Sequence, residues 1–88
     1  MANKRDLKKE INHVLGDIIE NVYLWESDNG GKRTKESEAI IEDAITTFDD
    51  LMARVNQRKI EDSKKHFRAI RNDLEKKALE LIDRINKL

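Results

Sequence analysis

The sequence predicts an all-α protein with three long antiparallel helices in an up-down-up bundle, forming one domain over residues 1–88. Apolar residues recur at steps of three or four along three separate segments, which is the period of one face of an α-helix. The 88 residues include no proline and three glycines, so little interrupts long helices. Charged residues make up 41% of the chain and apolar residues 38%, which is typical of a helical bundle with a solvated exterior.

The first helix is expected over about residues 4–27. Its apolar stripe consists of Leu7, Ile11, Val14, Leu15, Ile18, Val22 and Trp25. Asn3 is the expected N-cap, and Asp6 lies near the positive end of the helix dipole. Gly16 falls on the opposite face, which we expect to be exposed to solvent.

The segment ESDNGGKRTKESE, residues 26–38, separates the first two helices. A phosphate-binding loop would need Ser or Thr directly after Gly31-Lys32, but Arg33 stands there, and a helix rather than a strand leads in. Asp, Asn and the paired glycines are residues that tolerate left-handed backbone at the end of a helix. The segment is therefore expected to be a hinge.

The second helix is expected over about residues 35–57, with Thr34 as its N-cap. Its predicted stripe is Ile41, Ala44, Ile45, Phe48, Leu51, Met52 and Val55. Glu36 and Glu38 lie in its first turn, where carboxylates are favoured by the helix dipole.

The third helix is expected over about residues 60–88 because its apolar residues follow a heptad. One row is Ile60, Phe67, Leu74, Leu81 and Leu88, and a second row is Ile70, Ala78 and Ile85. Glu61 and Asp62 favour a start near residue 60, whereas Ser63 could cap a later start. Residues 56–59 contain neither glycine nor proline, so one long bent helix through them is an open alternative.

Charge is distributed unevenly along a chain whose net charge is zero. Residues 36–57 carry a net charge of −5 and residues 58–88 a net charge of +4, so neighbouring antiparallel helices can neutralise each other. The alternative is a basic surface kept for nucleic acid or another polyanion. Its candidate residues on the third helix are Lys64, Lys65, Arg68 and Arg71.

No set of residues predicts catalysis, a metal site or a cofactor, and we do not expect an enzyme. Cysteine is absent and two histidines are present. Glu10 and His13 have the spacing of a di-iron helix motif but no second copy exists, so both are expected on the surface. His13 is expected to pair weakly with Asp17. His66 has cations nearby and is expected to be solvated.

Several apolar residues lie beside the predicted stripes. They can widen the core, or they can form a second face that binds a protein partner or another copy of the chain in a homodimer. The partner-binding candidates are Ile19, Tyr23, Leu24, Leu79 and Ile82. We expect a non-enzymatic helical interaction or structural module, with polyanion binding as the alternative.

The chain start lacks the apolar run of a secretory signal, and no segment is long and apolar enough to span a membrane. We therefore expect a cytoplasmic protein. The opening MANKRDLKKEIN, together with HFRAIRNDLEKKALELIDRINKL, resembles a group of short uncharacterised bacterial proteins. The resemblance implies a bacterial cytoplasmic protein and supplies no activity or site residues.

Overall fold

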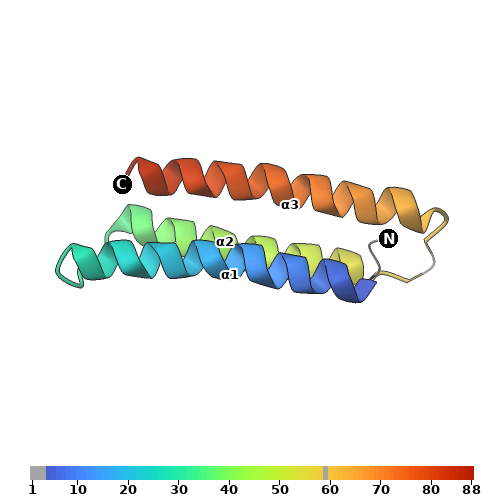
Figure 1. The fold of residues 1–88 in the computed structure, drawn as a ribbon, viewed down its shortest axis with the longest axis horizontal. Helices are drawn as coiled ribbons and strands as arrows, with labels where there is room; N and C mark the ends of the chain where they lie inside the picture. The colour runs from blue at the N-terminus through green and yellow to red at the C-terminus, as the bar shows by residue number, and fades with distance from the viewer. Residues whose placement is uncertain (1–3, 59) are drawn as a thin grey trace.

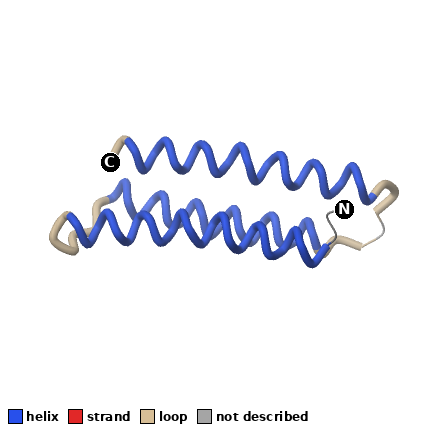
Figure 2. The backbone as a smooth tube through the Cα atoms, in the orientation of Figure 1, coloured by secondary structure: helices blue, strands red, loops and turns tan. Residues whose placement is uncertain are grey.

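The computed structural model describes residues 4–58 and 60–88 and confirms the predicted bundle of three helices. The helices are α1 (Lys4–Asp28), α2 (Lys35–Val55) and α3 (Ser63–Asn86). Successive helices run antiparallel, so α1 and α3 point in the same direction (Figure 1). The bundle is 49 Å long and 18 Å across. Helices and connecting loops account for all of the described residues, without a strand (Figure 2).

The core is one continuous cluster to which all three helices contribute. Its buried apolar residues are Leu7, Ile11, Leu15, Ile18, Val22, Ile40, Ala44, Leu51, Val55, Ile70, Leu74, Ala78 and Leu81. The predicted stripe of α1 and the predicted rows of α3 supply most of this cluster. Gly16 lies on the solvent face as predicted, and a Cβ added there would meet no atom within 4 Å.

The predicted stripe of α2 is confirmed at six of its seven residues and is wrong at Ile45. Ala44, Leu51 and Val55 are buried, and Ile41, Phe48 and Met52 pack against the core. Ile45 was expected in the core but is 48% exposed, whereas Ile40, which is not part of the predicted stripe, is 1% exposed. The buried row instead begins at Ser37 and continues through Ile40 and Ala44. Ser37 is polar, so apolar periodicity alone predicts a face of the helix that is slightly rotated from the buried one.

The hinge between α1 and α2 contains the expected glycines in left-handed backbone. Gly30 has φ of 79° and Gly31 has φ of 75°, a region that costs glycine no steric strain. The amide of Gly31 donates to the carbonyl of Glu26 at 2.8 Å, and that of Gly30 to Ser27 at 3.2 Å. These bonds form the terminating motif that satisfies the last carbonyls of a helix.

A buried polar contact joins the two sides of this hinge and was not predicted from the sequence. Thr34 caps α2 as expected, and its hydroxyl accepts from the Ser37 amide while the Ser37 hydroxyl accepts from the Thr34 amide, each at 3.0 Å. The Ser37 hydroxyl also donates to Oε2 of Glu26 at 2.7 Å. Glu26 and Ser37 are 5% and 0% exposed, so the end of α1 is bonded to the start of α2 inside the protein.

The connection between α2 and α3 separates two distinct helices, which excludes the single bent helix. α3 begins at Ser63, later than residue 60, because Asp62 is its N-cap and accepts from the Lys65 amide at 3.1 Å. Neither Glu61 nor Ser63 has this role. Two residues of interest, the expected cap Asn3 and Lys59 in this connection, lie outside the described residues.

Candidate protein-interaction surface

The five residues predicted to bind a partner lie on two sides of the bundle. Leu79, Leu24, Tyr23 and Ile82 are 70%, 56%, 49% and 43% exposed, whereas Ile19 is half-buried and packs against the core. Single exposed apolar side chains are common on protein surfaces, whereas a contiguous group of them indicates an interaction site. The positions of these residues relative to one another are therefore more informative than their number.

Leu24, Leu79 and Ile82 lie on the side of the bundle where α1 meets α3. Arg71 of α3 binds Glu10 of α1 at 2.9 Å, which identifies the rows that face this junction. Leu24 belongs to the row of Glu10 at steps of three and four, and Ile82 belongs to the row of Arg71. Leu79 is adjacent to Ile82 on the outer side of that row. We call this surface, made by Leu24, Leu79 and Ile82, the α1–α3 apolar face.

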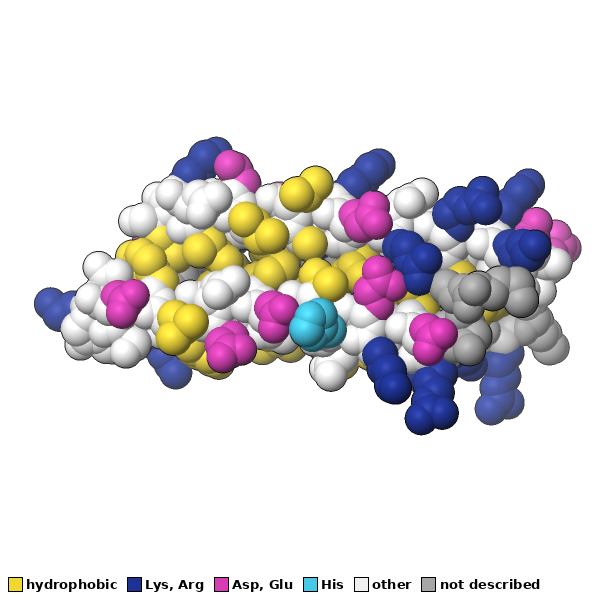
Figure 3. Space-filling view, in the orientation of Figure 1, with side chains coloured by type: hydrophobic (Ala, Val, Ile, Leu, Met, Phe, Trp, Pro, Cys, Tyr) yellow, Lys and Arg dark blue, Asp and Glu magenta, His cyan; other side chains and the backbone are white. Residues whose placement is uncertain are grey.

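The space-filling view shows hydrophobic side chains gathered between α1 and α3 (Figure 3). They are most continuous toward the end of the bundle where both helices finish, and acidic side chains lie along the α1 edge beside them. Lys and Arg gather at the opposite end. The molecule therefore combines an apolar surface and an acidic border in one half with basic groups in the other.

Tyr23 lies on a different side, where α1 meets α2. It lines a shallow groove of about 300 Å³ together with Arg33, Glu38, Ile41 and Glu42. Three of the five side chains on the wall of this groove are charged. The two exposed apolar areas are thus separated by the solvent face of α1.

The basic residues predicted on α3 are only partly available. Lys64, Lys65 and Arg68 are exposed. Arg71 is half-buried, and its guanidinium donates to Glu10 through Nε at 3.1 Å. Arg71 therefore has an internal partner and contributes less than predicted to a polyanion surface.

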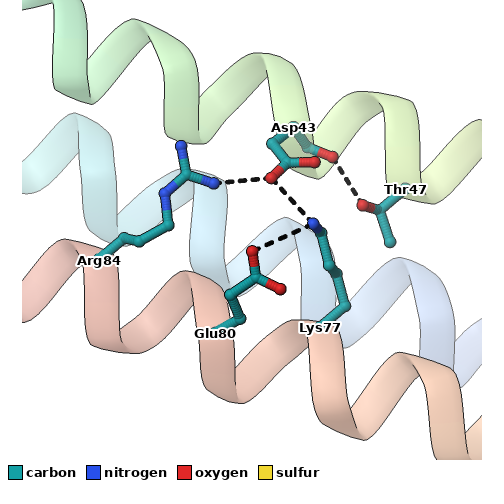
Figure 4. A network of polar contacts seen from close by, with 5 residues as sticks. All are labelled: Asp43, Thr47, Lys77, Glu80 and Arg84. Atoms are coloured by element: carbon teal, nitrogen blue, oxygen red, sulfur yellow. Dashed lines mark hydrogen bonds and ion pairs between the residues drawn. The ribbon is translucent and has the colours of Figure 1, made fainter.

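The predicted neutralisation between α2 and α3 is centred on Asp43. Its Oδ2 lies 2.6 Å from Nη1 of Arg84 and 3.0 Å from Nζ of Lys77 (Figure 4). Partial burial raises the pKa of Asp43, but the hydrogen bonds from Lys77 and Arg84 outweigh it, so this pKa lies below its usual range. The hydrogen bond to Asp43 raises the pKa of Lys77. These ion pairs join α2 to α3.

The two histidines lie in different surroundings. His13 is 78% exposed and lies 3.4 Å from Asp17, as predicted. His66 differs from the prediction because it is half-buried, with Nε2 2.6 Å from the carbonyl oxygen of Arg54 at the end of α2. Over residues 4–58 and 60–88, no three His, Cys, Asp or Glu side chains cluster as a metal site would require.

A second groove of about 350 Å³ lies between the start of α2 and the end of α3. Its wall consists of Lys35, Glu36, Ala39, Ile40, Arg84, Lys87 and Leu88. Arg84 is bound to Asp43, and Lys87 lies 2.9 Å from Asp83. Two of the three cations on this wall therefore already have carboxylate partners.

Comparison with known proteins gives no match to this chain among family models, curated proteins or solved structures. Within the described part of the chain, none of the helices has an apolar stretch that could cross a membrane. Inferences about function therefore depend on the surface geometry given above.

Proposed function

We propose that this chain is a non-enzymatic helical module that acts by contact with another protein through the α1–α3 apolar face. The observation that carries this proposal is that Leu24, Leu79 and Ile82 are exposed on rows facing the α1–α3 junction, while other residues form the core. These side chains add little to the fold. Covering them would remove apolar area from water at about 25 cal/mol per Å².

A photo-crosslinking side chain at position 79 tests this proposal in cells that express the chain natively. Position 45 is the matched control, because Ile45 is similarly apolar and 48% exposed but lies on α2. We expect protein adducts at position 79 in clear excess over position 45. Light scattering after gel filtration then shows whether the adduct is a second copy. A monomer at high concentration with no adduct at position 79 would contradict the proposal.

Polyanion binding is a second candidate, supported by an observation beyond α3 itself. α1 and α3 begin at the same end of the bundle, so the basic first turns of α1 share that end with the basic first turns of α3 (Figure 1). Lys and Arg side chains gather there (Figure 3). Clustered cations of this kind bind phosphates by releasing counterions, so affinity falls as salt rises.

A filter-binding titration with single-stranded and duplex nucleic acid at low salt distinguishes this second candidate. Binding that weakens with salt, and that a Lys64→Glu, Arg68→Glu variant abolishes, would support it. Binding that is absent at low salt would exclude it. The same variant leaves the α1–α3 apolar face unchanged, so it does not affect the first proposal.

A further inference from the structure

The border of the α1–α3 apolar face is acidic. From Glu10 to Asp28, α1 contains no Lys or Arg but five acidic residues: Glu10, Asp17, Glu20, Glu26 and Asp28. Asp17 and Asp28 share the row of Leu24, and Glu75 shares the row of Ile82 on α3. Asp17, Asp28 and Glu75 are all exposed. The apolar residues therefore have carboxylates on both sides.

Three cations of α3 are bound to carboxylates away from Asp17, Asp28 and Glu75. Lys77 and Arg84 point toward α2, where both bind Asp43. Arg71 is engaged with Glu10 further toward the start of both helices. Within the row of Leu24, α1 from Asp17 to Asp28 therefore has two exposed carboxylates and no Lys or Arg, and Asp17 lies 3.4 Å from Nε2 of His13.

We propose that the α1–α3 apolar face receives a basic amphipathic helix from a partner protein. This inference rests on the proposed function and specifies its partner. An apolar stripe on the incoming helix would cover Leu24, Leu79 and Ile82, and its Lys and Arg residues would meet Asp17, Asp28 and Glu75. The incoming helix would lie along α1 and α3 as the fourth member of a bundle.

The length of the surface suits a helix of modest size. The row from Val14 to Asp28 spans about 21 Å at 1.5 Å per residue, so a partner helix of about 15 residues would cover it. A second copy of this chain fits less well, because face-to-face association would place Asp17, Asp28 and Glu75 of one copy close to the same carboxylates of the other. Like charges at an interface oppose binding.

A pair of synthetic peptides tests the inference against the full chain. Both have about 15 residues and the same leucines at helical spacing, but one has Lys at the flanking positions and the other has Glu. Fluorescence anisotropy of the labelled peptides measures binding. We expect the basic peptide to bind at least about tenfold more tightly than the acidic one, with a preference that weakens as salt rises.

Variants of the chain locate the peptide on the surface. Leu79→Gln should weaken the basic peptide by about tenfold without unfolding, since Leu79 is 70% exposed. Ile45→Gln, which removes a comparable exposed side chain from α2, should have no effect. Asp17→Lys combined with Glu75→Lys should reverse the preference between the two peptides.

Equal binding of both peptides, no binding of either, or full binding to Leu79→Gln would overturn the inference. The crosslinking at position 79 separates this failure from failure of the proposed function. A crosslinked protein without a basic helix, or a second copy of the chain, would leave the interaction module standing and refute the helix partner. Absence of any adduct would refute both.

Discussion

Replacing Ser37 by alanine should reveal how much the polar contact at the hinge stabilises the bundle. The substitution removes the hydroxyl that donates to Glu26 at 2.7 Å and accepts from the Thr34 amide at 3.0 Å. Loss of a capping interaction costs about 0.5–1 kcal/mol. A buried carboxylate deprived of its donor costs about 1–3 kcal/mol more.

The total expected loss in the free energy of unfolding is therefore about 1.5–4 kcal/mol. For a domain of this size, at about 4–8 °C per kcal/mol, Tm should fall by roughly 6–32 °C. Urea and thermal unfolding followed by far-ultraviolet circular dichroism measure both quantities. Ser27→Ala is the matched control, because Ser27 is exposed in α1, and it should change stability by less than about 0.5 kcal/mol.

A double-mutant cycle distinguishes the buried contact from the cap. In a Glu26→Leu background the carboxylate is gone, so Ser37→Ala should cost only the capping part, about 0.5–1 kcal/mol. The reasoning is refuted if Ser37→Ala costs the same in both backgrounds. It is also refuted if the single substitution costs less than the Ser27→Ala control.

Three further changes test the core, the hinge and the charge cluster. Leu74→Ala should lower the free energy of unfolding in urea by about 2–5 kcal/mol, since Leu74 is 1% exposed, and an unchanged midpoint would contradict its place in the core. Gly30→Ala should lower Tm in calorimetry, because φ is 79°, and a raised Tm would exclude the left-handed turn. Asp43→Asn should destabilise the protein near neutral pH by about 1–2 kcal/mol. Because the pKa of Asp43 is lowered on folding, its stabilisation is present above the unfolded pKa and is lost as pH falls through the folded value, so wild type and variant should converge in acid.

The helices and most of the core could be predicted because apolar periodicity records which face of each helix is buried. Two positions of α2 could not, because Ser37 occupies a core position and Ile45 an exposed one, so the apolar residues indicate a face slightly rotated from the buried one. A capping pair at Thr34 and Ser37 was the available signal, since a side chain three residues after an N-cap can return a hydrogen bond.

The polar contacts across the two connections could not be predicted from local sequence patterns, because each joins residues of two different helices. Glu26 lies in a segment of loop-forming residues and meets Ser37 only after the chain reverses direction. His66 reaches the carbonyl of Arg54 for the same reason, across the second connection. Leu79 and Ile82 could be predicted as exposed because they lie outside the heptad rows. That they lie on the same side of the bundle as Leu24 could not be predicted, because it depends on which residues of α1 and α3 face each other.

An odd number of helices has a practical consequence for how this molecule can be handled. The first described residue, Lys4, and the last, Leu88, lie at opposite poles of a rod 49 Å long (Figure 1). A fluorophore or surface tether attached near Lys4 would sit far from Leu24 and Ile82 and leave them accessible. The same attachment near Leu88 would crowd the pole where they lie, so immobilised assays should anchor the chain by its beginning.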